Sequence, residues 1–471
     1  MNDLIKETDI LTDANASGLA FTSSSSLLTR GYYTLLYNLS SGMLPLNKLI
    51  SNKYLEVYGR ASRSASINSI ECFTYNLVKA IKLSQTEISV SLDKNKYNGV
   101  VINGKLISNN VGHEGTTKLL SLFEREGLIS VTKGYRIETP FGIKSKSGYI
   151  TLTQDLVKLV EDYVDPYRVQ LGVRVNVIIL RNDKQSDIQF TSSKYTREVI
   201  KVLTRYNKMM DRHLVEYNGV RLDTGLARIF NNDFNSGGRL YASGGSYQTI
   251  PSQMRSMIKI NGVETAEVDI KGSHISILHT MVGSRLLRGY DPYDIDMDGI
   301  AEYDMDKMSY MLCSFDEQHN PFRNLVKVAL LIMVNADSQK KASMALKAKL
   351  DSHINISVDV VDDMEDEQVS VLRMYGLKDV NIPKLFTAIK TKHHAIKEYF
   401  FSGAGVWLQK MEGDIFTNVI DKCIENDYPV LVIHDSCRAK IDNVKAIGEF
   451  IESAWLGVVG DTCNLTLEYE F

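Results

Sequence analysis

The sequence predicts an α+β fold with more than one domain. The chain has 471 residues and is 44% hydrophobic, which is enough for two or more separate cores. Helical apolar periodicity recurs in 67–84, 115–131 and 320–338. Short apolar runs in 264–270 and 429–435 each have an aspartate at or next to their end, Asp269 and Asp435.

The N-terminal half predicts a small domain at 67–165, after an arm and helices at 1–66. Its order of helix, helix, two β segments and helix resembles a winged helix. Between residues 48 and 150 there are 15 Lys and Arg against 8 Asp and Glu. We therefore expect nucleic-acid binding, to DNA rather than RNA, although a small α+β domain without a ligand stays open. The basic residues of the expected wing are Lys133, Arg136, Lys144 and Lys146.

We predict a helical connection at 166–236. The segment from 237 to 471 contains most of the short motifs that indicate chemistry. An acidic segment at 290–306 has seven carboxylates and no Lys or Arg. It opens like a calcium loop, but Met305 stands where a bidentate glutamate is needed. We expect an acidic connecting segment there, and on charge alone solvated surface stays open as the alternative.

Two aspartates carry the chemical prediction. Asp269 ends one predicted strand, and Asp435 ends the other directly after His434. Either aspartate alone would read as a turn former. Together, paired carboxylates can hold two divalent ions, Mg²⁺ or Mn²⁺, for phosphoryl transfer.

Basic residues between and before the aspartates predict phosphate contacts. Arg323 and Lys327 are four residues apart, so they share one face of a helix, and Asn335 lies eight further on. Arg323 and Lys327 can bind a triphosphate. Alternatively, their aliphatic side-chain carbons cover apolar surface of the helix while their charges stay in water. Upstream, Gly-Gly before Arg239 permits close backbone approach to a ligand, and Arg255 can also meet phosphates.

The order of these motifs resembles the palm and fingers of family A DNA polymerases and of single-subunit, phage-type RNA polymerases. "GGRLYA" is similar to their glycine–arginine motif, so Arg239 would contact primer and template. "EVDIKGSHISILH" is similar to motif A, which implies metal binding by Asp269 and the carbonyl of Ile270. "VLVIHDS" is similar to motif C, which implies that Asp435 is the second metal ligand and that His434 lies near the primer end.

The remaining motifs extend the resemblance to residues 235–440. "RNLVKVALLIMVNA" is similar to motif B, so Arg323 and Lys327 would hold the incoming nucleotide. "LQKMEGDI" is similar to a helix before motif C, so Gln409 would touch the primer–template minor groove. The family's motif B ends in Tyr-Gly where this chain has Asn335-Ala336, and His274 stands in for a sugar-selecting glutamate, which leaves the choice of sugar open.

The resemblance implies a right-hand polymerase, with an antiparallel palm sheet, a thumb at 166–236 and fingers at 283–400. "HDS" and "GRLYA" favour an RNA polymerase or primase-like enzyme that uses nucleoside triphosphates. The alternatives are a family A-like DNA polymerase and a winged-helix initiator or regulator whose polymerase-like half is inactive. A two-metal nuclease is disfavoured because it has no triphosphate for Arg323 and Lys327 to hold.

The remaining features of the sequence bear on the cellular compartment of the protein. There is no run of about 18 apolar residues, the N-terminus is polar, and five cysteines are widely scattered. We expect a cytoplasmic, reduced protein without membrane contact. The family resemblance, and not the composition, implies a phage or mobile element. Its oligomeric state, template and primer requirement stay open.

Overall fold

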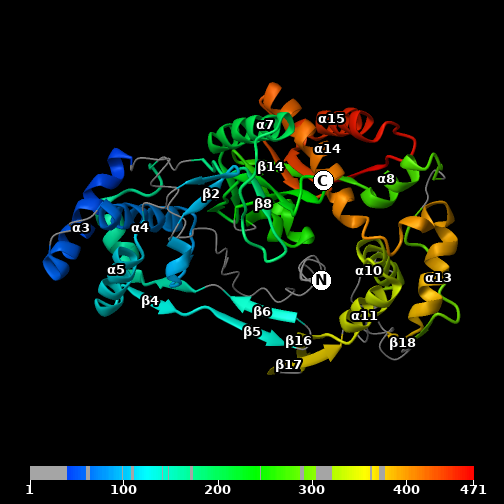
Figure 1. Cartoon of the computed structure of the whole chain (residues 1–471), viewed down its shortest axis with the longest axis horizontal. Coiled ribbons are helices and arrows are strands. Elements are labelled where there is room, and N and C mark those ends of the chain that lie inside the picture. The colour runs from blue at the N-terminus through cyan, green and yellow to red at the C-terminus, as the bar shows by residue number, and fades with distance from the viewer. Residues whose placement is uncertain are drawn as a thin grey trace.

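Two hydrophobic cores divide the protein. The computed structural model describes residues 40–59, 64–97, 99–107, 111–139, 142–146, 148–169, 173–243, 246–286, 291–303, 321–360, 363–370 and 377–471. One core is built from side chains between residues 43 and 169, and the other from side chains between 177 and 467. Figure 1 shows the N-terminal elements to one side of the remaining chain. The fold is mixed α and β, as the sequence predicted.

The N-terminal core is formed by helices around a small antiparallel sheet in the order β1-β7-β4. Helix α5 belongs to it because Leu119, Leu122 and Phe123 fall on one buried face, and the chain leaves the helix at Gly127, which has a positive φ. The elements are α3 (Leu44–Tyr58), α4 (Ser64–Lys82), β1 (Glu87–Ser89), α5 (His113–Arg125), β4 (Ile129–Thr132), β7 (Tyr149–Leu152) and α6 (Gln154–Tyr163).

The predicted wing region forms an antiparallel hairpin of β5 (Tyr135–Thr139) and β6 (Gly142–Lys146), which extends away from the helices (Figure 1). Lys133 is exposed just before it. The three other predicted basic residues lie on the hairpin strands, and their side chains are outside the described part of the structure. They are Arg136, Lys144 and Lys146.

A second hairpin joins the two cores. Strands β2 (Val100–Ile102) and β3 (Lys105–Ile107) are connected by Asn103 and Gly104, both with positive φ. The Asn103 side chain accepts hydrogen bonds from the backbone N–H groups of Val177 and Ile178, at the start of the second core. These contacts anchor the N-terminal domain to the rest of the chain.

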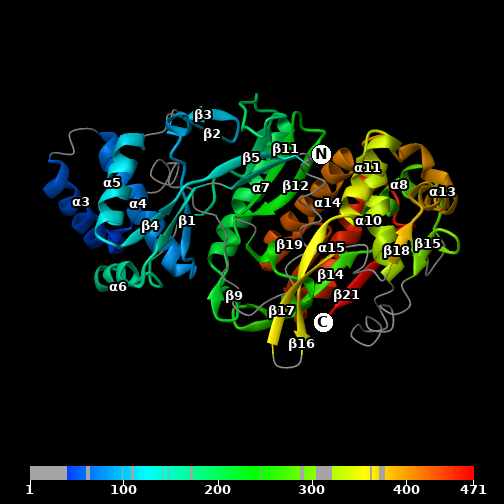
Figure 2. The same ribbon diagram turned by 90° about the horizontal axis from the view of Figure 1, so that it is seen from below.

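The C-terminal core surrounds a seven-stranded sheet in the order β10-β9-β13-β14-β20-β19, with β21 also paired to β14. Helix α15 packs on β14 and β20. Figure 2 shows this sheet between the N-terminal domain and helices α10 and α13. The elements are β9 (Val215–Tyr217), β10 (Val220–Arg221), β13 (Ile258–Ile260), β14 (Val263–Ile270), β19 (Val430–Ile433), β20 (Ser436–Lys440), α15 (Ile441–Val459) and β21 (Leu467–Glu470).

The predicted helical connection at 166–236 is wrong beyond its central helix. Helix α7 (Lys194–Asp211) starts at a capping box on Ser193, but strands precede and follow it. Asn218 and Gly219, both with positive φ, make the two-residue turn of the β9–β10 hairpin, a signal that the sequence contains. A three-stranded sheet completes the region, formed by β8 (Ile178–Arg181), β11 (Leu226–Asn231) and β12 (Gly237–Ala242).

The segment 283–400, predicted as helical, also includes strands. Its acidic residues Asp359, Asp363, Glu365, Asp366 and Glu367 lie on the two strands of an antiparallel hairpin. None of the described helices is both long and apolar enough to span a membrane. The elements are α8 (Ser273–Met281), β15 (Ala301–Tyr303), α10 (Pro321–Asn335), α11 (Gln339–Leu350), β16 (His353–Val360), β17 (Asp363–Ser370), β18 (Leu377–Val380), α13 (Ile382–Lys392) and α14 (Gly405–Glu425), of which α8 just precedes the segment and α14 follows it.

Helix α14 lies close to β12 at a glycine contact. A Cβ atom on Gly413 would collide with the carbonyl oxygen of Gly238 and with the Arg228 guanidinium. Arg228 is fully buried and donates to the Gly238 carbonyl and to the Asp414 carboxylate, at 2.6 and 2.7 Å. This contact fixes α14 against the sheet that presents Arg239.

Gly413→Ala should destabilise the protein. Alanine normally stabilises a helix relative to glycine by about 1 kcal/mol, but here overpacking should cost roughly 1–3 kcal/mol. Urea unfolding would measure the difference. The matched control is Gly457→Ala in α15, where an added Cβ meets no atom within 4 Å. It should be neutral or stabilising, and equal behaviour of the two variants would contradict the close packing.

Candidate active site

The register of the central sheet brings the two predicted aspartates together. Strands β14 and β20 are antiparallel, and Asp269 lies opposite Ser436, the residue after Asp435. The backbone N–H of Ile270 donates to the carbonyl oxygen of Asp435 at 3.2 Å. Asp435 occupies the tight turn between β19 and β20 together with His434, whose φ of 58° is left-handed. Two residues 166 positions apart therefore share one edge of the sheet.

Burial and repulsion by neighbouring carboxylates perturb the pKa of both aspartates. Burial raises the pKa of Asp269 well above its ordinary value, and the charges of Asp435 and Glu267 add to that rise. Burial, followed by the charge of Glu412, raises the pKa of Asp435. Two desolvated carboxylates that repel each other are stabilised by a shared cation, and their hard oxygens are the ligands that Mg²⁺ prefers. This donor set fits the divalent ions that the sequence predicted.

The aspartate pair is an open site rather than a closed metal cage. Across the described residues, no group of three or more His, Cys, Asp or Glu side chains has the arrangement of a metal site. Mg²⁺ commonly binds through one or two carboxylates and fills its remaining positions with water and substrate phosphates. Such a pair suits ions that bind together with a phosphorylated substrate.

Helix α10 brings Lys327 close to the aspartates, while Arg323 pairs with Asp291 beside them. The charge of Lys327 partly offsets the rise in the pKa of both Asp269 and Asp435, so its ammonium is close enough to act on both carboxylates. The Arg323 guanidinium lies 4.9 Å from the ring centroid of Tyr293, and the Lys327 ammonium lies 6.0 Å from it. Arg323 and Lys327 share one helix face, as their spacing predicted.

Two residues beside α10 were missed by the sequence reasoning. Tyr293 is buried, and burial followed by the charge of Asp435 raises the pKa of its hydroxyl. Asp291 accepts from Arg323 Nε at 2.9 Å and from the backbone N–H of Tyr293 at 2.9 Å. Both residues belong to the segment interpreted as an acidic connection or solvated surface. The only feature of the sequence that could have pointed to these two residues is the Asp-Pro-Tyr tripeptide.

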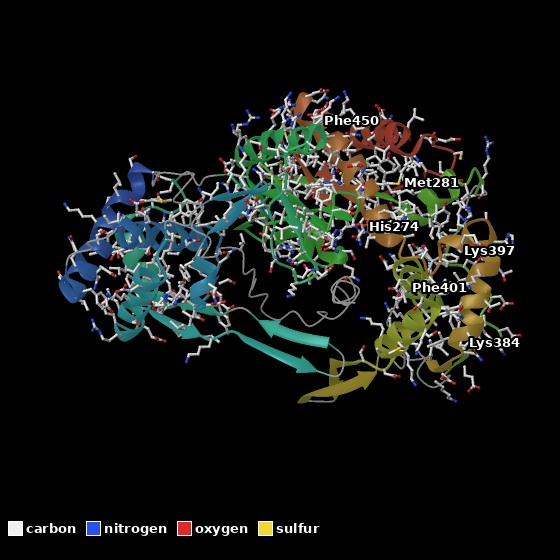
Figure 3. The ribbon with its side chains drawn as sticks, in the orientation of Figure 1. His274, Met281, Lys384, Lys397, Phe401 and Phe450 are labelled. Carbon is white, nitrogen blue, oxygen red and sulfur yellow. The ribbon has the colours of Figure 1, made fainter. Side chains whose placement is uncertain are left out.

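Arg239 takes part in a buried cluster with Glu412 and His274. Arg239 lies 2.8 Å from the Glu412 carboxylate, and His274 Nε2 lies 3.2 Å from its other oxygen. Glu412 is 1% exposed. Burial opposes its ionisation, but the charges of Arg239 and His274 outweigh burial and hold the pKa of Glu412 well below its usual range. Figure 3 shows His274 where α8 approaches the C-terminal elements. Sequence reasoning missed Glu412, although it stands three residues after Gln409.

A second buried carboxylate supports the sheet beneath the aspartates. Glu267 is two residues before Asp269, so both side chains are on one face of β14. It accepts from Arg438 at 3.1 Å, from Arg255 at 3.3 Å and from the Ser436 hydroxyl. A glutamate in place of Ser436 would bring another carboxylate against Glu267, which is a physical reason for serine after Asp435.

The other predicted residues fall into four positions. Burial, followed by the charge of Arg239, lowers the pKa of His434 to about 4, so this imidazole is neutral beside the aspartates at pH 7. Gln409 is half-buried on α14, one turn before Glu412. Asn335 ends α10 and packs against Gly405, where an added Cβ would collide with its amide. The predicted wing residues belong to the N-terminal domain, outside the core that carries the aspartates.

Comparison with known proteins gives no sequence match and a weak structural similarity. No family model matches the sequence, and no curated protein does. Among solved structures, the chain is similar to the POL domain of Pol1 from M. smegmatis in complex with DNA primer-template and dNTP. The sequences are 11% identical, the TM-score is 0.26, and the match covers 94% of this chain and 66% of that one. At that TM-score the similarity assigns no fold, so inferences about function rest on the site.

Proposed function

We propose that the chain is a template-directed nucleotidyltransferase that joins nucleoside triphosphates at the Asp269–Asp435 site. The observation that supports this most is the β14–β20 register, which puts two aspartates side by side within electrostatic reach of Lys327. A phosphoryl-transfer site needs carboxylates for metal ions and fixed cations for the phosphates. A nuclease needs the carboxylates but has no use for a triphosphate grip.

Each residue has a defined task in this proposal. Asp269, Asp435 and the carbonyl of Ile270 would hold two Mg²⁺ or Mn²⁺ ions, which lower the pKa of an attacking hydroxyl and neutralise a leaving pyrophosphate. Lys327 and Arg323 bind the triphosphate, as a point charge and a planar fork. Neutral His434 lies beside the primer end. His274, held by Glu412, borders the sugar of the incoming nucleotide.

The architecture fits a right-hand polymerase in this proposal. The sheet that contains β14, β19 and β20 would be the palm, α10, α11 and α13 the fingers, and the mixed segment 166–236 the thumb. The N-terminal domain would hold the DNA template with the β5–β6 hairpin as its wing, through Lys133, Arg136, Lys144 and Lys146. Arg239 and Gln409 would contact the primer–template duplex. Because Arg239 is paired with Glu412, its role toward nucleic acid combines contact with positioning.

We propose ribonucleotides as the substrate, in an RNA polymerase or primase-like reaction. Serine follows the second aspartate, and a histidine replaces the glutamate that selects deoxyribose in the DNA enzymes that the sequence resembles. Purified protein with a single-stranded DNA template, Mg²⁺ and NTPs should yield products without a primer. Products from dNTPs alone would favour the DNA polymerase alternative. Template shortening would indicate a nuclease, and binding without products would indicate an inactive scaffold.

Lys327→Ala should chiefly weaken nucleotide use. Loss of one charge-assisted phosphate contact is expected to reduce kcat/KM for the nucleotide by roughly 10- to 100-fold, mostly through KM. Steady-state kinetics with a saturating template would measure it. Lys347→Ala, at an exposed position of α11, is the matched control and should leave both constants unchanged. Unchanged kinetics in Lys327→Ala would contradict its phosphate role.

A further inference from the structure

A polar cavity lies between the two cores, away from the aspartates. It has a volume of about 60 Å³. Its wall is made by the end of α4 from the N-terminal domain and by the end of α7 and the loop after β10 from the C-terminal core. A water needs about 10–15 Å³ measured in this way, so the space suits a group with four oxygen atoms.

The lining of the cavity has an excess of positive charge. Four cationic side chains face two carboxylates, an excess of two positive charges. The two lysines are buried and the two arginines are half-buried. The lysines therefore lie out of water, whereas a ligand from solvent can reach the arginines. The cations are Lys79, Lys82, Arg174 and Arg221, and the carboxylates are Asp211 and Asp223.

The side chains of the lining contact both a carboxylate and backbone carbonyl oxygens, and Arg174 donates to the carbonyl oxygens of Gly225 and Tyr241. Lys79 forms an ion pair with Asp223 at 2.9 Å. Lys82 donates to the carbonyl oxygen of Val169, and Arg221 donates to the carbonyl oxygen of Asp211 at 3.4 Å. Burial, followed by the nearby charge of Arg221, lowers the pKa of Lys82, while the charges of Asp211 and Asp165 partly oppose that shift. Two cations that oppose each other in a partly desolvated space are stabilised by an anion between them.

We propose that this cavity binds a phosphate group and thereby ties the N-terminal domain to the C-terminal core. A dianionic phosphate matches the excess of two charges, and its four oxygens can accept from lysine and arginine donors of both domains. Such an anion has two sources, a free phosphate or pyrophosphate and a backbone phosphate of a bound nucleic acid. The inference goes beyond the proposed catalytic function, because these residues do not belong to the aspartate site.

Thermal unfolding and calorimetry with inorganic phosphate test the proposal on the full chain. At constant ionic strength, phosphate should raise the Tm of the unmodified protein, and chloride should not. Arg221→Gln and Lys82→Met should each weaken phosphate binding by about tenfold, because each removes a charge-assisted hydrogen bond. Arg212→Gln is the matched control, since Arg212 is next to Asp211 but pairs with exposed Asp427 outside the cavity.

A second arm distinguishes the two sources. If a backbone phosphate occupies the cavity, Arg221→Gln should also weaken binding of a single-stranded oligonucleotide and reduce the salt slope by about one. If a free anion occupies it, oligonucleotide affinity should stay unchanged while phosphate affinity falls. Equal stabilisation by phosphate and chloride, or equal phosphate affinity in Arg221→Gln and the unmodified protein, would overturn the proposal. Neither readout depends on nucleotide incorporation, so failure here leaves the proposed catalytic function standing.

Discussion

Asp269→Asn and Asp435→Asn should each abolish metal-dependent nucleotide incorporation, with losses on the order of a thousandfold or more. Asparagine keeps the size of the side chain and removes the charge that holds the ions. Both proteins should still fold and bind DNA, because the register of β14 and β20 depends on backbone hydrogen bonds rather than on these carboxylates. Single-turnover primer or product extension, together with a DNA-binding titration, would measure the two effects separately.

Without metal, Asp269→Asn and Asp435→Asn should each be more stable than the unmodified protein. Because burial and repulsion raise the pKa of both aspartates, the metal-free protein loses stability as the pH rises from the unfolded value of about 3.9 through the raised folded values. Each asparagine removes that cost, so Tm at pH 7–8 should rise. Mg²⁺ should stabilise the unmodified protein more than either variant.

Asp427→Asn is the matched control for both measurements, since Asp427 is exposed and paired with Arg212 away from the site. It should alter neither incorporation nor the response to Mg²⁺. Full incorporation by both Asp269→Asn and Asp435→Asn would refute the two-ion assignment. Equal stabilisation of all proteins by Mg²⁺ would show that the ions bind elsewhere.

Glu412→Gln should give the largest loss of folding stability among single substitutions at the site, roughly 3–5 kcal/mol in urea unfolding. The change leaves the Arg239 guanidinium buried without its counterion. It should also lower the pKa of Asp435, because the charge of Glu412 raises it. Asp427→Asn, which breaks an exposed pair, should cost less than about 1 kcal/mol.

The pH dependence of the unfolding free energy can show whether Glu412 stabilises the protein through its charge or only through its packing. Since the pKa of Glu412 is held below its usual range, its contribution is present above the unfolded value of about 4.3 and is lost as the pH falls below that value. In Glu412→Gln the part of the acid dependence that belongs to this group should disappear. An unfolding free energy that falls equally with acid in both proteins would mean that Glu412 contributes by shape alone.

Local patterns allowed much of the site to be predicted. Alternating apolar residues predicted the strands that end at Asp269 and Asp435, and four-residue spacing predicted that Arg323 and Lys327 share a face. The same patterns failed at 212–232, where the Asn218-Gly219 turn makes a hairpin in a segment taken as helical. Charge counting failed at Asp291 and Tyr293, because it cannot tell a solvated carboxylate from one that holds an arginine.

The sequence by itself determined the strand ends, the α10 face and the types of residue that bind cations and phosphates, because these follow from periodicity within one element. Only the tertiary structure decided which residues from distant elements became partners. The Arg239–Glu412 pair joins residues 173 positions apart, and the β14–β20 register joins residues 166 apart. Such pairs depend on how elements pack, since contacts across a sheet or between domains leave no periodic signal along the chain.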